Sequence, residues 1–406
     1  MIERIVIENF KSFVKADLRL GPMNILIGTN ASGKSNFFDA LHVIQGIGYG
    51  FTLFEILDGK PKGATGEMWE AVRGGSQRAA FEALDTPNAQ EPVIRIAIEG
   101  TVDKKDMRYM IAFAPKEGRL REERFSLGGD IYDSTPIQRM GTDPVFEVRY
   151  YGGKQGRAPH VKFEPSRPVI AQMARGNGNW KEEHTTAAAQ VCRMFADMQR
   201  IDPAPALLRS YSQAHQIQRM GERGENFAAL VNAICADEKT KAAYLSWLRE
   251  LRPQEVDDVL TKPGAVGEPM FVLREGGREF PAPVLSDGTL RFAAIAAAFF
   301  QPDMPSMMTI EEMENGVHAS RVRLLIELLR SRSHAGITQL VATTHSPIVL
   351  AWLKREEYAT TFYCKRDDKT GESRICPLKD IPHFADIVAK QPISDLFAEG
   401  WMETAL

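Results

Sequence analysis

The sequence lacks an apolar run long enough to cross a membrane. Its longest such run, Phe292–Phe300, has nine residues, whereas a membrane-spanning helix needs about 20. The chain begins at Met1–Arg4 with an alternating strand pattern and shows no signal peptide. Cysteine is also scarce. Four cysteines, widely spaced and without a CxxC pair, favour a reduced compartment over a disulfide framework or a zinc site. These absences predict a cytoplasmic protein with no membrane partner.

An excess of either charge is missing as well. The 406 residues contain 50 Lys and Arg against 53 Asp and Glu, a net charge of −3, which excludes a globally basic nucleic-acid binder. One segment departs from this balance. Residues 148–181 hold seven basic side chains and one acid, so the segment carries +6 and leaves −9 for the rest. The basic residues of this segment are Arg149, Lys154, Arg157, Lys162, Arg167, Arg175 and Lys181.

The same segment contains aromatic residues, Tyr150, Tyr151, Phe163 and Trp180. Basic and aromatic side chains together are compatible with phosphate contact and base stacking. The alternative is a solvated loop that links two lobes. The hypothesis from composition is that segment 148–181 touches DNA.

Both ends of the chain show an α/β pattern. Near the start, the apolar run Met23–Ile27 predicts a strand buried on both faces, followed by a helix over 34–45. Near the end, strands over 307–310 and 339–342 enclose a helix over 321–331. The two ends are therefore predicted to be halves of one α/β core.

The middle of the chain reads as an insertion. Helices are predicted over 186–198 and 227–251, and a hairpin over 270–280 turns at two glycines. No a/d pattern persists for three or four heptads, which excludes a long coiled coil. The predicted division is an N-terminal lobe over 1–147, a partly helical insertion over 148–280 and a C-terminal lobe over 281–406.

Residues 28–35, Gly-Thr-Asn-Ala-Ser-Gly-Lys-Ser, match the phosphate-binding pattern G-x-x-x-x-G-K-[ST] between a strand and a helix. The glycines let backbone N–H groups face a β-phosphate at the positive end of that helix. Lys34 is predicted to reach the β- and γ-phosphates, and the Ser35 hydroxyl to bind Mg²⁺. Kinases, GTPases and ABC-type ATPases share this pattern, so it predicts a nucleotide with Mg²⁺ but not which kind of enzyme binds it. The expected nucleotide-binding residues are Gly28, Asn30, Ser32, Gly33, Lys34, Ser35 and Asn36.

Two further strands end in residues that suit phosphate chemistry. The apolar run Met307–Ile310 is followed by Glu311 and Glu312. The first acid is predicted to support Mg²⁺ and the second to polarise the attacking water as general base. The strand over 339–342 leads to His345, which is placed to contact a γ-phosphate at the carboxyl edge of a sheet. A solvated strand end and a structural histidine are the alternatives.

Residues 285–291, Leu-Ser-Asp-Gly-Thr-Leu-Arg, lie at a predicted helix N-terminus. Ser286 and the exposed backbone amides there predict a second anion-binding site. An ordinary N-cap turn is the alternative.

As a set, these motifs resemble the ABC-type ATPases of the RecF/SMC/OLD group, especially its small bacterial ATPases. The resemblance covers the whole core, because it spans positions 9 to 347. It implies an ABC-type P-loop ATPase head with a mixed sheet. The matching segments are Asn-Phe-Lys-Ser at 9–12, GTNASGKSN at 28–36, LSDGTLR at 285–291, IEEMENGVH at 310–318 and TTHSP at 343–347.

The resemblance implies a homodimer or higher oligomer in which heads meet head to tail around two ATP molecules. Ser286 and Gly288 would face the γ-phosphate from the opposite subunit. Glu311 would be the metal-side acid and Glu312 the general base. The remaining implied roles are phosphate and Mg²⁺ binding by Lys34 and Ser35, the switch histidine at His345, and contact with the base and ribose by Asn9 and Lys11.

Three positions depart from the family pattern. Glu311 stands where most ABC ATPases have Asp, Met313 replaces the usual proline, and Asp287 replaces a signature glycine and adds negative charge near the phosphates. The glutamine of the Q-loop has two candidates, Gln77 and Gln138.

The function predicted from the sequence is ATP hydrolysis linked to DNA, in repair or anti-phage defence, with a separate effector such as a nuclease. No nuclease is expected within the 61 residues after His345, since Asp367 and Asp368 read as a hairpin turn. The alternative is an ATP-dependent regulatory scaffold that controls a partner protein without touching DNA.

Overall fold

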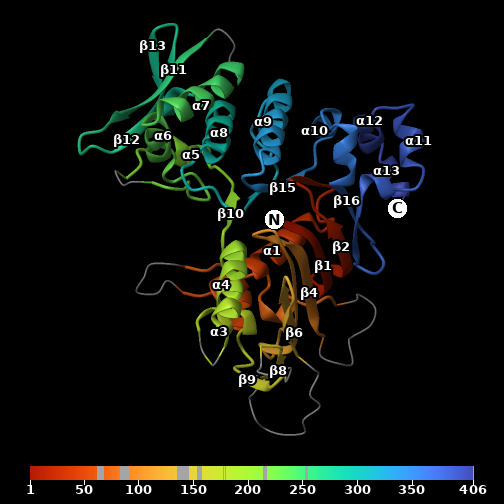
Figure 1. The fold of residues 1–406 in the computed structure, drawn as a ribbon. Coiled ribbons are helices and arrows are strands. Elements are labelled where there is room, and N and C mark those ends of the chain that lie inside the picture. Colours follow the sequence, from red (N-terminus) through yellow and green to blue (C-terminus); the bar gives the residue numbers. More distant parts are fainter. Residues whose placement is uncertain are drawn as a thin grey trace.

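The computed structural model describes residues 1–61, 68–82, 92–134, 146–152, 158–176, 178, 180–213, 217–251 and 255–405. These residues form three sheets and the helices that cover them (Figure 1).

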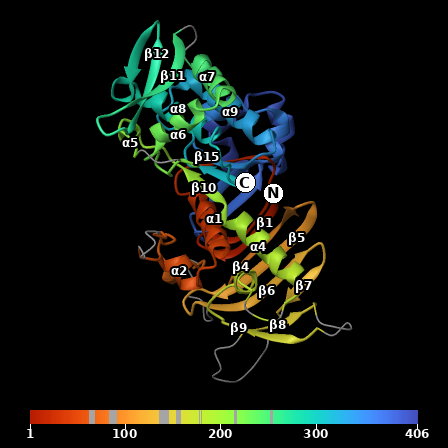
Figure 2. The ribbon, with the colours of Figure 1, turned by 60° about the vertical axis from the view of Figure 1, so that its left-hand side comes forward.

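The first sheet is antiparallel and occupies the lower half of Figure 1. Burial alternates along several of its strands; in β4 the buried apolar side chains are Ile94, Ile96 and Ile98. Those side chains share one core with α1 (Lys34–Tyr49), α3 (Val169–Ala174) and α4 (Glu182–Ala196), and Figure 2 shows α1 and α4 along that side of the sheet. The strand order is β2 (Phe13–Arg19), β1 (Ile2–Phe10), β4 (Ile94–Val102), β5 (Lys105–Ala114), β6 (Arg119–Leu127), β7 (Asp130–Asp133), β8 (Phe146–Tyr150) and β9 (His160–Phe163).

The second sheet positions the candidate site. Its strands run parallel except at the β17 edge. Alternate residues of the central strands enter different cores: Leu26 and Val341 belong to the first core, Ile25 and Ala342 to the second. A strand buried on both faces needs such a continuous apolar run. The order is β10 (Met198–Ile201), β14 (Met307–Ile310), β15 (Gln339–Thr344), β3 (Met23–Ile27), β16 (Thr361–Arg366) and β17 (Ser373–Pro377).

A separate lobe at the upper left of Figure 1 holds the third, antiparallel sheet. It contains β11 (Val256–Pro263), β12 (Pro269–Glu275) and β13 (Arg278–Pro281), with α5 (Pro205–Leu208), α6 (Phe227–Cys235), α7 (Glu238–Leu251) and α8 (Asp287–Ala298). The other helices are α2 (Leu53–Asp58), α9 (Val322–His334), α10 (Pro347–Ala351), α11 (Phe384–Val388), α12 (Ile393–Ala398) and α13 (Trp401–Ala405).

The α/β core, the strand at Met23–Ile27 and the hairpin at Gly276 and Gly277 agree with the sequence predictions. The single helix predicted over 227–251 is wrong, because α6 ends at Cys235 and α7 begins at Glu238. The break has a local cause. The Asp237 carboxylate accepts a hydrogen bond from the Thr240 backbone N–H at 2.8 Å, the contact that starts a new helix.

Two absences hold for the described ranges. No helix there is long and apolar enough to cross a membrane, and none extends into a long coiled coil. The division at 147/148 and 280/281 stays a prediction; those two positions fall inside β8 and β13.

Candidate functional site

The phosphate-binding loop connects β3 to α1, as the sequence predicts. Two of its glycines lie where a larger residue does not fit. Gly28 has φ +151°, and an added Cβ would lie 2.3 Å from the Cys364 carbonyl oxygen. Gly33 has φ +110°, and its Cβ would lie 2.7 Å from Ser373 Oγ. The left-handed backbone and the close approach of neighbouring strands therefore require glycine at both positions.

Lys34 points back into this loop. Its Nζ donates to the carbonyl oxygens of Gly28 and Thr29, each at 2.7 Å, and the residue is 9% exposed. Burial lowers the pKa of Lys34 below its ordinary value, and the opposing effect of nearby acidic groups, which include Glu312 and Glu314, is smaller. The ammonium is thus held against the loop, with two of its three N–H groups donating to loop carbonyl oxygens.

The same loop has donor capacity that the described residues leave unused. The Ser32 hydroxyl is buried and has no hydrogen-bond partner there. Ser35 is the second residue of α1, so its hydroxyl lies at the positive end of the helix. A buried free hydroxyl, an inward ammonium and a glycine cradle form the donor set that a phosphate requires. These loop residues fit the phosphates of a nucleotide, and Ser35 and Glu311 carry the oxygen ligands that Mg²⁺ prefers.

The turn at residues 9–12 contacts α1 through a hydrogen bond and an ion pair. Asn36 Nδ2 donates to Ser12 Oγ at 2.6 Å, and Asn9 Nδ2 donates to the Val93 carbonyl oxygen at 3.2 Å. Lys11 Nζ lies 3.5 Å from Asp39 Oδ2 on α1; burial lowers the pKa of Lys11, and Asp39 opposes that shift. The turn at 9–12 therefore packs beside the loop, while base and ribose contact by Asn9 and Lys11 stays a prediction.

Strands β14, β15 and β3 are adjacent and parallel, so their carboxyl ends bring the acids, the histidine and the P-loop to one edge. Glu312 has a left-handed backbone, φ +44°, which is uncommon outside glycine and costs about 1 kcal/mol. Its N–H donates to Thr343 Oγ1 at 2.9 Å. His345 Nδ1 lies 4.0 Å from Glu312 Oε1 and 3.8 Å from Glu314 Oε1.

Glu314 was not singled out in the sequence analysis, yet it lies at the centre of this edge. Its side chain is 10% exposed. Oε1 accepts hydrogen bonds from Thr344 Oγ1 at 2.8 Å and from the His345 backbone N–H at 3.3 Å, whereas Oε2 is buried without a partner among the described residues. The signal in the sequence that could have indicated Glu314 is the third acid of Ile-Glu-Glu-Met-Glu, which follows the strand in a loop.

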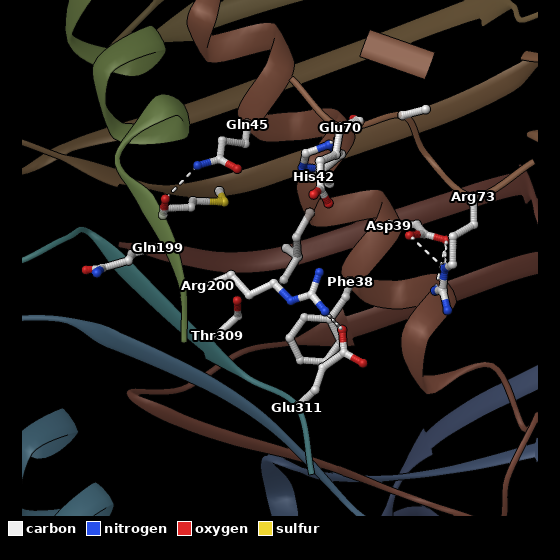
Figure 3. Close-up of a pocket in the computed structure, with 13 residues that line it drawn as sticks. Phe38, Asp39, His42, Gln45, Glu70, Arg73, Gln199, Arg200, Thr309 and Glu311 are labelled. Atoms are coloured by element: carbon white, nitrogen blue, oxygen red, sulfur yellow. Dashed lines mark hydrogen bonds and ion pairs between the residues drawn. The ribbon is translucent and has the colours of Figure 1, made fainter. Parts of the chain in front are cut away.

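Glu311 points to a different neighbour. Its Oε1 lies 3.3 Å from Arg200 Nη2 on β10, the strand beside β14. Figure 3 shows this pair at the side of a cavity that His42 and Glu70 also line. Sequence reasoning missed Arg200 because β10 and β14 are about a hundred residues apart in the chain.

Of the Q-loop candidates, Gln77 belongs to a short 3₁₀ turn at Ser76–Arg78, and Gln138 lies outside the described residues. Two other glutamines, Gln45 on α1 and Gln199 on β10, line the same cavity as Glu311.

The signature residues Ser286 and Gly288 lie in another part of the chain. Ser286 caps α8, with Oγ accepting from the Thr289 N–H at 3.2 Å. A Cβ on Gly288 would lie 2.7 Å from the Gly316 carbonyl oxygen, so α8 packs closely against the loop after β14. Asp287 is ion-paired with Arg209, which offsets the negative charge that it adds.

Ser286 and Gly288 open onto a groove that they share with His318, Arg321 and Phe280. The P-loop residues do not line this groove. The P-loop at the sheet edge and the start of α8 are therefore separate places on the described chain.

The structure gives several side chains of the basic segment internal roles. Arg167 and Arg175 both donate to the carbonyl oxygen of Gly50, the C-cap of α1. Trp180 stacks on Phe163 with ring centroids 5.3 Å apart and meets Tyr150 edge-on at 4.8 Å. These five residues stabilise the fold; Lys154 and Arg157 lie outside the described residues.

A P-loop, an acidic strand end and a histidine on adjacent parallel strands, with a signature serine on a separate lobe, define the ABC-type ATPase class. Residues 1–49 match the family described as "AAA ATPase domain", and residues 236–351 match "AAA domain, putative AbiEii toxin, Type IV TA system". The fold and the motif set resemble those of RecF/SMC-like ABC-type ATPases.

Two curated proteins show the relationship in sequence. An "ATP/GTP phosphatase" of Helicobacter pylori is 23% identical over 384 residues, covering 91% of this chain and 94% of that protein. A "DNA replication and repair protein RecF" of Chlamydia muridarum is 28% identical over 115 residues, only 28% of this chain and 27% of that protein.

Solved structures show the same fold. An SMC head bound to the C-terminal winged-helix domain of ScpA superposes with a TM-score of 0.52 and 13% identity, covering 92% of this chain and 97% of that one. An SMC head with an extended coiled coil, bound to the C-terminal domain of ScpA from Pyrococcus furiosus, gives 0.50 and 12%, covering 96% and 99%. At these identities the likeness concerns the fold.

Proposed function

We propose that this protein hydrolyses ATP as a homodimer in which each nucleotide lies between two subunits. The observation that carries the proposal is the division of the site. Lys34 and the acids lie at the sheet edge, while Ser286 and Gly288 open onto a separate groove. A second copy arranged head to tail would bring the two half-sites together.

Each residue at the sheet edge has a role in this proposal. The P-loop amides and Lys34 bind the phosphates. Ser35 and Glu311 would hold Mg²⁺, which offsets phosphate charge during transfer. Glu312 orients and deprotonates the attacking water. His345 contacts the γ-phosphate from the end of β15.

The Glu312→Gln variant tests this proposal. Removing the base should lower turnover by about 10²–10³-fold while ATP binding remains. The variant should then accumulate as a dimer or larger species in ATP, measured by size-exclusion chromatography with light scattering. Glu99→Gln, on β4 in the first sheet, is the matched control. Full activity in Glu312→Gln contradicts the assignment of the base.

We propose further that this ATPase acts on or senses DNA, in repair or anti-phage defence, with a separate effector such as a nuclease. The partial similarity to RecF supports this, as does the charge of segment 148–181. Duplex DNA should stimulate turnover, and charge reversal of Lys154, Arg157 and Lys162 should weaken DNA binding. Unchanged, salt-insensitive DNA affinity would contradict direct contact.

A regulatory scaffold that controls a partner protein is the second candidate. It is favoured by the internal roles of Arg167, Arg175 and Trp180, which leave fewer basic and aromatic side chains for nucleic acid. Turnover that ignores DNA but changes with a co-purifying protein would support this function over the first.

A further inference from the structure

Arg200 and Glu311 form an ion pair between two neighbouring strands. Arg200 lies opposite Thr309 in the parallel pairing of β10 with β14, so it is level with the residue two positions before Glu311. The Nη2–Oε1 distance is 3.3 Å. In Figure 3 the Arg200 guanidinium points toward Glu311, whereas Gln199 points away from it.

Arg200 has a second acidic partner, Glu222. Its Nε lies 3.2 Å from Glu222 Oε1. Glu222 belongs to the segment that leads to α6 in the separate lobe, and its carbonyl oxygen accepts from the Asp202 N–H at 2.8 Å, directly after β10. One guanidinium therefore bridges an acid of the separate lobe and the metal-side acid of the sheet edge.

The ion pair with Arg200 affects how well Glu311 can bind a divalent cation. A guanidinium on one carboxylate oxygen neutralises the charge that would attract a divalent cation, and two cations on the same carboxylate repel each other. Beside the pair lies a cavity of about 170 Å³, lined by Arg200, His42, Glu70 and Glu311. This volume exceeds that of several waters, so the guanidinium has room to leave Glu311 while Nε stays near Glu222.

We propose that Arg200 is a positioning residue that forms an ion pair with Glu311 when no metal is bound. When Glu311 binds Mg²⁺, the Arg200–Glu311 ion pair breaks and the Arg200–Glu222 ion pair remains. The inference rests on the proposed function, because it takes Glu311 as the metal-side acid. Glu222 is then the acid that holds the Arg200 side chain in the metal-bound state. Removing Arg200 and removing the Glu222 charge must change metal affinity in opposite directions.

Mn²⁺ binding, followed by the electron paramagnetic resonance signal of the free ion, tests this directly. The full chain is titrated with Mn²⁺ alone and with a non-hydrolysable ATP analogue. Arg200→Gln should bind Mn²⁺ about three- to fivefold more tightly, since an exposed ion pair contributes that much to an equilibrium. Glu222→Gln should bind it about threefold more weakly, because Arg200 then has only Glu311 as partner.

Arg274→Gln is the matched control for Arg200→Gln. Arg274 is 41% exposed where Arg200 is 45% exposed, and it also has two acidic partners, Asp258 and Glu279, but in the third sheet. This variant changes the net charge equally and should leave Mn²⁺ affinity unchanged. Arg200→Lys keeps a cation and should fall between Arg200→Gln and the wild type, and melting temperatures verify folding.

Two results overturn the inference: Arg200→Gln binding Mn²⁺ no more tightly than Arg274→Gln, or Glu222→Gln shifting affinity in the same direction as Arg200→Gln. Failure of the proposed function looks different. In that case the wild type itself binds no Mn²⁺ with the analogue, whereas a wild type that binds metal while its variants match it defeats only the role of Arg200.

Discussion

Glu314 Oε1 accepts a hydrogen bond from Thr344 Oγ1 at 2.8 Å, which ties the loop after β14 to the end of β15. The same oxygen accepts from the backbone N–H of His345. The residue proposed to contact the γ-phosphate is therefore held by an acid 31 positions earlier in the chain. This link leads to the first prediction.

Glu314→Ala should lower turnover by about 10- to 100-fold with little change in nucleotide affinity, because misplacing a group that acts only in the transition state has that effect. Glu314→Gln keeps an acceptor for Thr344 and should retain more activity than the alanine variant. Steady-state kinetics and equilibrium binding of a fluorescent ATP analogue separate these effects. Glu356→Ala, whose side chain is 75% exposed, is the control. Equal loss of binding and turnover would argue for a general structural defect.

Gly288→Ala should weaken the half-site at α8. The added Cβ would lie 2.7 Å from the Gly316 carbonyl oxygen, so α8 and the loop after β14 must separate. We expect ATP-dependent dimerisation and turnover to fall about tenfold or more, while the monomer still binds nucleotide through its P-loop. Gly129→Ala, where a Cβ meets nothing within 4 Å, should behave as wild type. Normal dimerisation of Gly288→Ala contradicts the trans role of α8.

Arg175 should contribute to stability and not to DNA binding. Its Nη2 donates to the Gly50 carbonyl oxygen at 3.0 Å, at the negative end of α1. Arg175→Gln should lower the free energy of unfolding by about 0.5–1.5 kcal/mol and leave DNA affinity unchanged. The exposed Lys162 is the comparison: Lys162→Gln should leave stability unchanged and, if segment 148–181 contacts DNA, reduce the salt dependence of binding. Reversed effects of the two variants would contradict this assignment.

Glu123 should make stability depend on pH. It is fully buried and accepts hydrogen bonds from Val169 N–H, Ile170 N–H, Tyr132 and Tyr109. Burial raises its pKa from 4.5 to about 7, against the opposing effect of those donors. Between these values the folded state holds a proton that the unfolded state has released, so the free energy of unfolding falls as pH rises, by up to about 3 kcal/mol.

Denaturant unfolding from pH 4.5 to 8 measures this effect. In Glu123→Gln the free energy of unfolding should fall less as pH rises, because the contribution of Glu123 is gone. Glu122 is a neighbouring acid paired with Arg95 and Arg124, and the Glu122→Gln variant should show the same fall as the wild type. A Glu123→Gln curve parallel to the wild type would show that the buried carboxyl does not titrate in this range.

The local parts of the site were predictable because their determinants are local. The P-loop requires glycines, a lysine and a serine at fixed spacing, and its flanking strand and helix follow from the residues beside it. The resemblance of the ordered motifs to those of a known family then implied the ABC-type head. The break at Asp237 was missed, since a single side-chain acceptor outweighed the helical periodicity on either side.

The nucleotide loop and the acidic and histidine strand ends were thus predictable from the chain alone, since each depends on a short segment with a characteristic pattern, and the whole motif set resembles a known class of ATPase. Which residues these segments contact depends on the folded structure. Parallel pairing placed Arg200 against Glu311 and Glu314 against His345, and packing against α1 directed Arg167 and Arg175 inward. Such contacts join residues far apart in the chain, and their geometry arises when the strands pair and the helices pack.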